Sequence, residues 1–252
     1  MAKIIAVTGK GGTGKTTVTS LILRHLKQHA VGPILALDAD PDSNLSTVLG
    51  LTVEKTIGDL REETLRSIND LPAGIAKGQY IEAGLHEIVV ESEKVDLIAM
   101  GRSEGPRCYC YINNLLRTFS DHLQASYEWV VVDNEAGLEH LSRRTASRID
   151  HLFVVITDNP LAVDCAKRIE QLTNDKDYPV VNKYLLANNI VDENRVRKRV
   201  AASGLNMELV GCVPRDPELE AKLMAGESVF SLAGSPAVLA IEEVMKVIQA
   251  KQ

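Results

Sequence analysis

The chain has 252 residues, of which 45% are hydrophobic and 25% are charged, and its formal net charge is −6. This composition is typical of a soluble globular protein, and the acidic balance argues against a general nucleic-acid-binding surface. No apolar run approaches the roughly 18 residues of a membrane span, the first residues lack a secretory h-region, and four cysteines are too few for a disulfide scaffold. We therefore expect a cytoplasmic protein without nucleic-acid or membrane partners.

Seven short apolar runs along the chain predict β-strands. They are nearly continuously apolar, as expected of strands that are buried on both faces of a sheet. They span residues 3–8, 33–38, 95–100, 129–133, 151–157, 183–190 and 207–213.

Helical patterns lie between and after these runs. Apolar residues recur at helical spacing over residues 16–29, 56–68 and 235–249. Ser235, which precedes Pro236, is expected to be the N-cap of the last helix. The stretch 54–92 contains no clear strand, so we expect it to pack as helices over the sheet or at a subunit interface. Strands alternating with helices predict a single α/β domain over residues 1–252, with a mostly parallel twisted sheet flanked by helices.

The stretch GKGGTGKTT at residues 9–17 follows the first strand and opens the first helix. It matches the phosphate-loop (P-loop) pattern G-x-x-x-x-G-K-[ST], in which backbone N–H groups and a helix N-terminus surround the phosphates of a nucleotide. Lys15 is expected to reach the β- and γ-phosphates, and the Thr16 hydroxyl to ligate Mg²⁺. The other residues expected to bind the nucleotide in this loop are Gly9, Gly11, Gly12, Thr13, Gly14 and Thr17.

Lys10 gives the loop a second lysine, in the pattern G-K-G-G-x-G-K-T-T. With this lysine the sequence resembles the deviant Walker A ATPases, the group that includes MinD, ParA and the nitrogenase iron protein. The resemblance implies a P-loop NTPase that forms a homodimer, in which Lys10 reaches the phosphates of the partner subunit. Charge stabilisation of the transferring phosphoryl group would then be complete only in the dimer. The alternative is that Lys10 is a solvated lysine.

Acidic residues follow two of the predicted strands. LDADPDSN places Asp38, Asp40 and Asp42 at the end of the second strand, and VVVDNEAG ends another strand in Asp133. Hydrolysis needs one carboxylate to orient the attacking water and others to hold hydrated Mg²⁺. The resemblance assigns Asp40 to the water and Asp38 to a place near the metal. Asp133 suits a Walker B role, holding Mg²⁺ through water, and Gly137 would sense the γ-phosphate. An acid at a strand end can also be only a helix cap.

The identity of the base depends on residues after the later strands. Guanine is usually read in such folds by N-K-x-D, whereas this chain has NNIV at 188–191 and so lacks the lysine and the aspartate. No carboxylate is then expected at the guanine N1/N2 edge, and we expect the nucleotide to be ATP. Asn188 and the VPRD turn, with Pro214 and Asp216, are expected near the adenine.

Two cysteines, Cys108 and Cys110, stand one residue apart in GRSEGPRCYCYINN. We expect them in the extended entry and first turn of a helix, where both sulfurs can face one way. A helix N-terminus and nearby arginines favour thiolates, which bind soft or borderline metals. Two thiolates are too few for a closed tetrahedral site, but a homodimer would supply four. The alternatives are idle or buried cysteines and a strained redox disulfide. Cys165 and Cys212 fall in apolar patterns and are expected to be structural.

The combination of GKGGTGKTT, DADPDSN, CYCYINNLLR and DNEAGLEHLSRRT resembles the CooC-type accessory ATPases over nearly the whole chain. The resemblance implies an ATP hydrolase that binds Ni²⁺ or Zn²⁺ through Cys108 and Cys110 at its dimer interface. It also implies a role in nickel insertion into carbon monoxide dehydrogenase or acetyl-CoA synthase. The client enzyme and the native metal stay open. His140 is expected to be either a switch residue or a plain helix-face histidine.

Two other functions remain as alternatives. An electron-donating ATPase like the nitrogenase iron protein would hold an iron–sulfur cluster through one cysteine after each of two strands, and the stretch after residues 129–133 offers none. A spatial-organisation ATPase like MinD or ParA would need a C-terminal amphipathic anchor or a basic DNA-binding surface. The C-terminal EEVMKVIQAKQ is short and carries little basic charge, and the chain as a whole is acidic.

Overall fold

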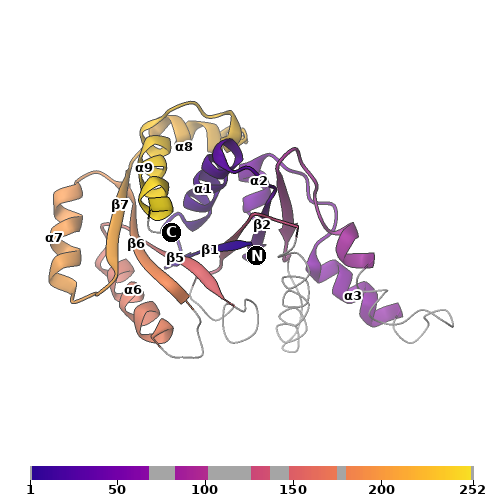
Figure 1. Cartoon of the computed structure of the whole chain (residues 1–252), viewed down its shortest axis with the longest axis horizontal. Helices are drawn as coiled ribbons and strands as arrows, with labels where there is room; N and C mark the ends of the chain where they lie inside the picture. The colour runs from indigo at the N-terminus through magenta and orange to yellow at the C-terminus, as the bar shows by residue number, and fades with distance from the viewer. Residues whose placement is uncertain (1, 68–82, 102–125, 137–147, 175–179, 251–252) are drawn as a thin grey trace.

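Seven strands form one parallel sheet at the centre of the molecule (Figure 1). The computed structural model describes residues 2–67, 83–101, 126–136, 148–174 and 180–250. The strand order is β3-β2-β4-β1-β5-β6-β7, and each neighbouring pair is parallel. All seven predicted strands are confirmed, and β5 and β6 begin earlier than predicted. The strands are β1 (Lys3–Gly9), β2 (Ile34–Ala39), β3 (Val95–Ala99), β4 (Trp129–Asn134), β5 (Ile149–Ile156), β6 (Val180–Ile190) and β7 (Glu208–Pro214).

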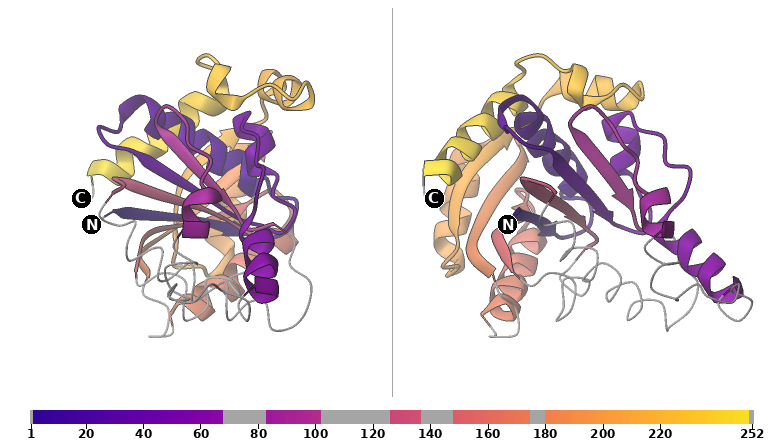
Figure 2. Two further views of the ribbon diagram at one scale, coloured as in Figure 1. Left: turned by 90° about the vertical axis from the view of Figure 1, so that its right-hand side faces the viewer. Right: turned by 45° about the vertical axis from the view of Figure 1, so that its right-hand side comes forward.

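Helices cover both faces of the sheet, which gives three layers (Figures 1 and 2). Apolar residues of α1, α2, α8 and α9 share one core cluster with one face of the strands. Those of α6 and α7, and separately those of α3, pack against the opposite face. In the described part of the chain, no helix is long and apolar enough to cross a membrane. The helices are α1 (Lys15–His29), α2 (Leu45–Leu49), α3 (Ile57–Ser67), α6 (Pro160–Thr173), α7 (Glu193–Ser203), α8 (Pro217–Met224) and α9 (Pro236–Ala250).

The register of the strands brings the acidic residues to the edge where the P-loop lies. In the pairing of β2 with β4, Asp38 is the partner of Asp133. In the pairing of β1 with β4, Val7 is the partner of Asp133, and β1 ends two residues later at Gly9. Because the carboxyl ends of parallel strands meet at one edge of a sheet, the P-loop and both carboxylates lie together there.

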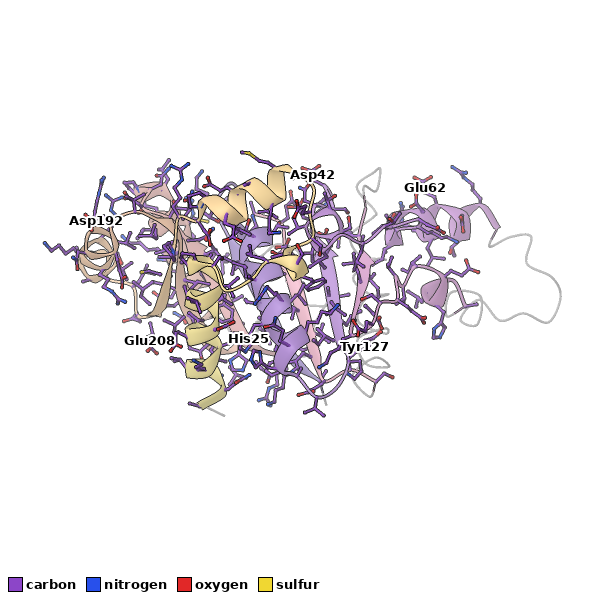
Figure 3. All side chains as sticks on the ribbon, turned by 90° about the horizontal axis from the view of Figure 1, so that it is seen from above. His25, Asp42, Glu62, Tyr127, Asp192 and Glu208 are labelled. Atoms are coloured by element: carbon purple, nitrogen blue, oxygen red, sulfur yellow. The ribbon has the colours of Figure 1, made fainter. Side chains whose placement is uncertain are left out.

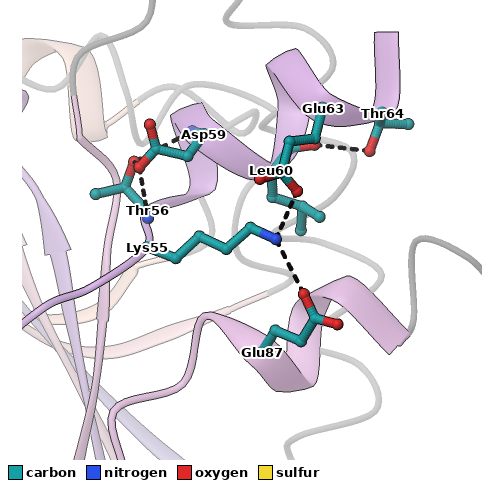
Figure 4. A network of polar contacts seen from close by, with 7 residues as sticks. All are labelled: Lys55, Thr56, Asp59, Leu60, Glu63, Thr64 and Glu87. Carbon is teal, nitrogen blue, oxygen red and sulfur yellow. Dashed lines mark hydrogen bonds and ion pairs between the residues drawn. The ribbon is translucent and has the colours of Figure 1, made fainter. Parts of the chain in front are cut away.

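The stretch predicted to be helical between residues 54 and 92 packs over the sheet in its described part. Ile57 and Leu60 of α3 share a core cluster with Leu85 and Ile88, which belong to or follow a short helix at 83–87. Lys55 bridges the two helices through carboxylates on each of them (Figure 4). This unit lies at the end of the molecule opposite α7 (Figure 1).

Ser235 stands at the N-cap position of α9 as predicted, because the helix begins at Pro236, but the side-chain acceptor comes from another residue. The N–H of Ala237 donates a hydrogen bond of 3.0 Å to the carboxylate of Asp216. The capping oxygen therefore comes from the turn between β7 and α8 and not from the residue next to the helix. Tertiary packing supplies the stronger, charged acceptor in place of the local hydroxyl.

Candidate functional site

The loop between β1 and α1 has a backbone that only glycine adopts easily. Gly9, Gly12 and Gly14 have φ values of 148°, 78° and 83°. A Cβ at Gly9 would clash with the main-chain oxygen of Val155, and a Cβ at Gly14 would clash with the side chain of Asn188. The positive φ values and the close neighbours together explain why glycine stands at these positions.

The loop leads into a helix N-terminus that no side chain caps. Gly14 occupies the N-cap position of α1 in a left-handed conformation, without a side-chain hydrogen bond. Thr13 turns inward instead, and its N–H and hydroxyl both donate to the main-chain oxygen of Lys10, at 3.3 and 2.8 Å. The first N–H groups of α1 are thereby left for an anion, which is the arrangement found where helices bind phosphate.

The two lysines of the loop differ in burial. Lys15, the first residue of α1, is 8% exposed, whereas Lys10 is half-buried. An ammonium group that is nearly buried needs a charged or hydrogen-bonding partner in the protein interior. Lys15 therefore suits an anion held by the loop, and Lys10 can extend beyond it.

Two buried carboxylates, Asp38 and Asp133, stand side by side behind the loop. Asp38 is 2% exposed and Asp133 is 1% exposed. Burial, followed by the neighbouring charge of Asp133, raises the pKa of Asp38 to about 7. Burial likewise raises the pKa of Asp133 to about 6, although the hydroxyls of Thr16 and Thr19 and the charge of Lys15 act in the opposite direction. Two adjacent carboxylates with raised pKa values favour a cation between or beside them.

Asp133 has an oxygen that suits a bound magnesium ion. Its Oδ1 accepts a hydrogen bond of 3.1 Å from the Thr19 hydroxyl, and its Oδ2 is buried without a partner among the described residues. Both oxygens of Asp38 are in use, because Oδ1 accepts from the N–H of Asp40 and Oδ2 from the N–H of Leu45. Hard oxygen donors of this kind fit Mg²⁺ with its waters. Asp133 is thus the better ligand, and Asp38 mainly supports the loop.

Asp40 and Asp42 lie on the loop that follows β2. The Oδ1 of Asp40 accepts a hydrogen bond of 3.0 Å from the N–H of Asp42, and the main-chain oxygen of Asp40 accepts from the N–H of Ser43 at 2.9 Å. Asp40 is half-buried and Asp42 is exposed (Figure 3). The loop therefore holds Asp40 in a fixed turn at the end of β2. One strand, β4, lies between β2 and β1, which leads into the P-loop. A water-orienting carboxylate is predicted at this edge of the sheet.

A cavity of about 160 Å³ lies between the P-loop and the ends of the later strands. It is bounded by the loop on one side and by the β7–α8 connection on the other. The three residues predicted near the adenine, Asn188, Pro214 and Asp216, all line it. Its other lining residues are Gly12, Thr13, Gly14, Thr17, Thr157, Asn189, Val213, Leu219, Glu220 and Leu223.

The predicted metal-binding cysteines, Cys108 and Cys110, lie outside the described residues, as do Gly137 and His140. Within the described ranges, no group of three or more His, Cys, Asp or Glu side chains could hold a metal ion. The other two thiols, Cys165 and Cys212, are half-buried and pack against one apolar cluster, as expected for structural cysteines. Burial raises the pKa of Cys212, which keeps its thiol protonated.

The sequence did not point to two polar residues of the site, Thr19 and Asn134. Thr19 supports Asp133, and its position three residues after Thr16 on α1 is the signal that could have revealed it. Asn134 is 1% exposed, and its Nδ2 donates 2.9 Å to the main-chain oxygen of Val7, which ties the end of β4 to β1. No sequence pattern predicts a hydrogen bond between a side chain and the main chain of a strand that is distant along the chain.

The chain matches known proteins in sequence. Residues 4–229 match the model of the CbiA family, described as the CobQ/CobB/MinD/ParA nucleotide binding domain. An uncharacterised ATP-binding protein of Methanocaldococcus jannaschii is 42% identical over 231 residues, which cover 91% of each chain. The carbon monoxide dehydrogenase accessory protein CooC of Rhodospirillum rubrum is 30% identical, over 91% of this chain and 90% of that protein.

Solved structures share the fold. The cell division ATPase MinD of Pyrococcus furiosus superposes with a TM-score of 0.75 at 19% identity, over 100% of both chains. The septum site-determining protein MinD of Pyrococcus horikoshii, in complex with Mg-ADP, superposes with a TM-score of 0.72 at 19% identity, over 98% of this chain and 96% of that one. The α/β P-loop fold predicted from the sequence is confirmed.

Proposed function

This chain belongs to the CobQ/CobB/MinD/ParA nucleotide-binding family and is an ATPase, and we propose that its hydrolysis of ATP serves metal insertion into another enzyme. In this proposal residues 1–252 form one domain, which dimerises with ATP and binds Ni²⁺ or Zn²⁺ through Cys108 and Cys110. The client is carbon monoxide dehydrogenase or acetyl-CoA synthase. The observation that carries the ATPase part is the buried Oδ2 of Asp133 beside the P-loop, which has no hydrogen-bond partner among the residues that the structure describes.

The nucleotide part assigns a task to each group at the edge of the sheet. The N–H groups of the P-loop and Lys15 hold the phosphates of ATP, and Thr16 and Asp133 hold Mg²⁺, which neutralises phosphate charge when bound. Asp40 orients the attacking water. Lys10 is assigned to the phosphates of the partner subunit, so that hydrolysis depends on the dimer. Asn188 and Pro214 lie against the adenine.

The metal part is supported by the C-x-C pair and by the similarity to the CooC of Rhodospirillum rubrum, whose name assigns it to carbon monoxide dehydrogenase. One pair from each of two subunits supplies four thiolates, which completes a tetrahedral site for the cargo ion. Each thiol must lose its proton to bind, so metal affinity rises with pH. Because a shared ion binds the dimer and not the monomer, it also favours dimerisation by mass action.

Metal titration read by native mass spectrometry tests the proposal. The wild-type chain is expected to bind one Ni²⁺ or Zn²⁺ per two chains, and Cys108→Ser or Cys110→Ser to lose the ion while still binding ATP. Cys165→Ser and Cys212→Ser are matched controls, because these thiols are half-buried in an apolar cluster and are expected to leave metal binding unchanged. Undiminished binding of one ion per dimer in both Cys108→Ser and Cys110→Ser would overturn the shared site.

A second candidate is a spatial-organisation ATPase, favoured by the structural similarity to MinD over the whole chain. That similarity shows the fold, and the chain carries an acidic net charge of −6 that does not suit DNA. Cosedimentation with anionic liposomes or with DNA in the presence of ATP distinguishes the two functions. ATP-dependent pelleting with either one, without metal binding, would replace the metal-insertion proposal.

A further inference from the structure

The carboxylate of Asp216 joins the N-termini of two helices beside the cavity that lies between the P-loop and the ends of the later strands. Its Oδ1 accepts hydrogen bonds of 3.1 Å from the N–H groups of Glu218 and Leu219 in α8. Its Oδ2 accepts a hydrogen bond of 3.0 Å from the N–H of Ala237 in α9. Asp216 is 3% exposed, so water does not compete for these bonds. One side chain therefore fixes where α8 begins relative to α9.

The charge of Asp216 suits this position. Burial alone would raise the pKa of Asp216, but hydrogen bonds from Ser235 and from backbone N–H groups of both helices hold it below its ordinary value. The N-terminus of each helix also carries partial positive charge, which favours a carboxylate. An uncharged side chain at this position would leave buried N–H groups without a comparable acceptor.

α9 is in turn fixed to α1, which starts at the P-loop. The Nε and Nη2 of Arg24 on α1 donate to the main-chain oxygen of Leu232 at 3.0 and 2.7 Å, just before α9. The Arg24 guanidinium also lies 3.8 Å from the carboxylate of Glu242 on α9. Figure 1 shows α1, α8 and α9 gathered on the same side of the sheet. The hydrogen bonds of Asp216 therefore connect α8, through α9, to α1, the helix that follows the phosphate-binding loop.

One wall of the pocket is made by α8. Leu219, Glu220 and Leu223 of this helix line the cavity that residues of the P-loop also line. We infer that Asp216 is a positioning residue for ATP, which sets this wall against the P-loop by joining α8 to α9, and that it does not read the base with its own carboxylate. The inference rests on the ATP-binding part of the proposed function and is independent of the metal part.

Two substitutions separate positioning from base reading. Asp216→Asn removes the charge, and Asp216→Ser keeps a hydroxyl that can cap α8 but is too short to reach α9. Both are expected to weaken ATP binding about tenfold, as the loss of one buried charged cap implies. Inosine triphosphate, which has an oxygen in place of the adenine amino group, is expected to lose affinity by the same factor. The turnover number at saturating ATP is expected to stay within about twofold.

Calorimetric titration with both nucleotides and a steady-state assay give these values. Asp192→Asn is the control, because Asp192 is also a helix N-cap but an exposed one, accepting from the N–H of Arg195 in α7 at 3.1 Å, at an end of the molecule away from the pocket (Figure 3). It is expected to leave both affinities unchanged.

Three outcomes count against the inference or its premise, and each is recognisable. A selective loss of ATP over inosine triphosphate would make Asp216 a base contact. Unchanged affinities for both nucleotides in folded Asp216→Ser would show that the bond between Asp216 and α9 stabilises the fold but does not position ATP. If Asp216→Asn does not fold, Asp216→Ser decides, since it retains the local cap. Absence of ATP turnover in the wild-type chain would instead count against the proposed function.

Discussion

The side-chain amide of Asn188 donates a hydrogen bond of 2.9 Å to the main-chain oxygen of Thr13. Asn188 is 7% exposed, and its Nδ2 occupies the space that a Cβ on Gly14 would need. The end of β6 is thereby fixed to the P-loop, so the part of the site that faces the base and the part that faces the phosphates are held as one piece. The Nδ2 is committed to this bond, which leaves Oδ1 for a donor in the pocket.

Gly14→Ala should abolish this arrangement. The methyl group would collide with Asn188, and φ at this position is 83°, which alanine adopts only at a cost of about 1 kcal/mol. We expect ATP affinity to fall at least tenfold in calorimetric titration. Gly226→Ala is the control, because Gly226 has a φ of 69° with no atom within 4 Å of the new methyl group. Equal effects of the two substitutions on ATP affinity would contradict the role of the Asn188 contact.

Asp133→Asn should stabilise the nucleotide-free chain at pH 8 and remove its Mg²⁺-dependent ATPase activity. An amide keeps an oxygen for the Thr19 hydroxyl and takes a buried charge away from Asp38. Because the pKa of Asp133 is raised from 3.8 to about 6, the gain in the free energy of unfolding is about 3 kcal/mol. Thermal denaturation in the presence of a chelator measures it, and a lower melting temperature at pH 8 would contradict it.

The pH dependence of this effect follows from the direction of the shifts. An acid whose pKa is higher in the folded state holds its proton more tightly there, so ionisation costs folding free energy. The wild-type chain should therefore become more stable as pH falls through about 7 and about 6, the pKa values of Asp38 and Asp133. The advantage of Asp133→Asn over the wild type should shrink as pH falls from about 6 toward the ordinary pKa of 3.8, and it should be small only near pH 4.

The sequence predicted the parts of the site that lie within one strand, loop or helix. It missed the hydrogen bonds between elements that are distant along the chain. The P-loop follows from residues 9–17 alone, because glycines, lysine and helix start are local. Asp133 follows from an apolar strand that ends in an acid. Asp216 was expected near the adenine, but its bond to Ala237 depends on how α8 packs against α9, and no local pattern encodes that. The same holds for the bond between Asn134 and Val7.

Lys10→Ala and Lys15→Ala should have different consequences. Lys15 is nearly buried at the start of α1, so its loss should abolish nucleotide binding. If Lys10 acts on the partner subunit, Lys10→Ala should leave ATP binding to each monomer intact and weaken ATP-dependent dimerisation, with slower hydrolysis. Light scattering with and without ATP measures the dimer. Unchanged dimerisation in Lys10→Ala would make this residue an ordinary surface charge.

Lys55→Met should loosen α3 without changing ATP affinity. The Lys55 ammonium lies 2.6 Å from a carboxylate oxygen of Glu63 on α3 and 2.9 Å from one of Glu87 (Figure 4). The hydrogen bonds that the Lys55 ammonium donates to these two carboxylates raise the pKa of Lys55, so its contribution is complete below about pH 10 and is lost only as pH rises further. Methionine keeps the apolar stem and leaves two carboxylates facing each other.

The expected loss for Lys55→Met is about 1 kcal/mol, because the side chains of Glu63 and Glu87 are 50% and 63% exposed and water screens the pair. A chain of this size should then melt about 2–4 °C lower, by the same amount from pH 6 to pH 9 and by less at high salt. Lys246→Met is the control, since Lys246 pairs with Glu243 on the exposed face of α9 and should have no measurable effect. Equal melting temperatures for Lys55→Met and the wild type at low salt would show that Lys55 does not hold α3 to the helix at 83–87.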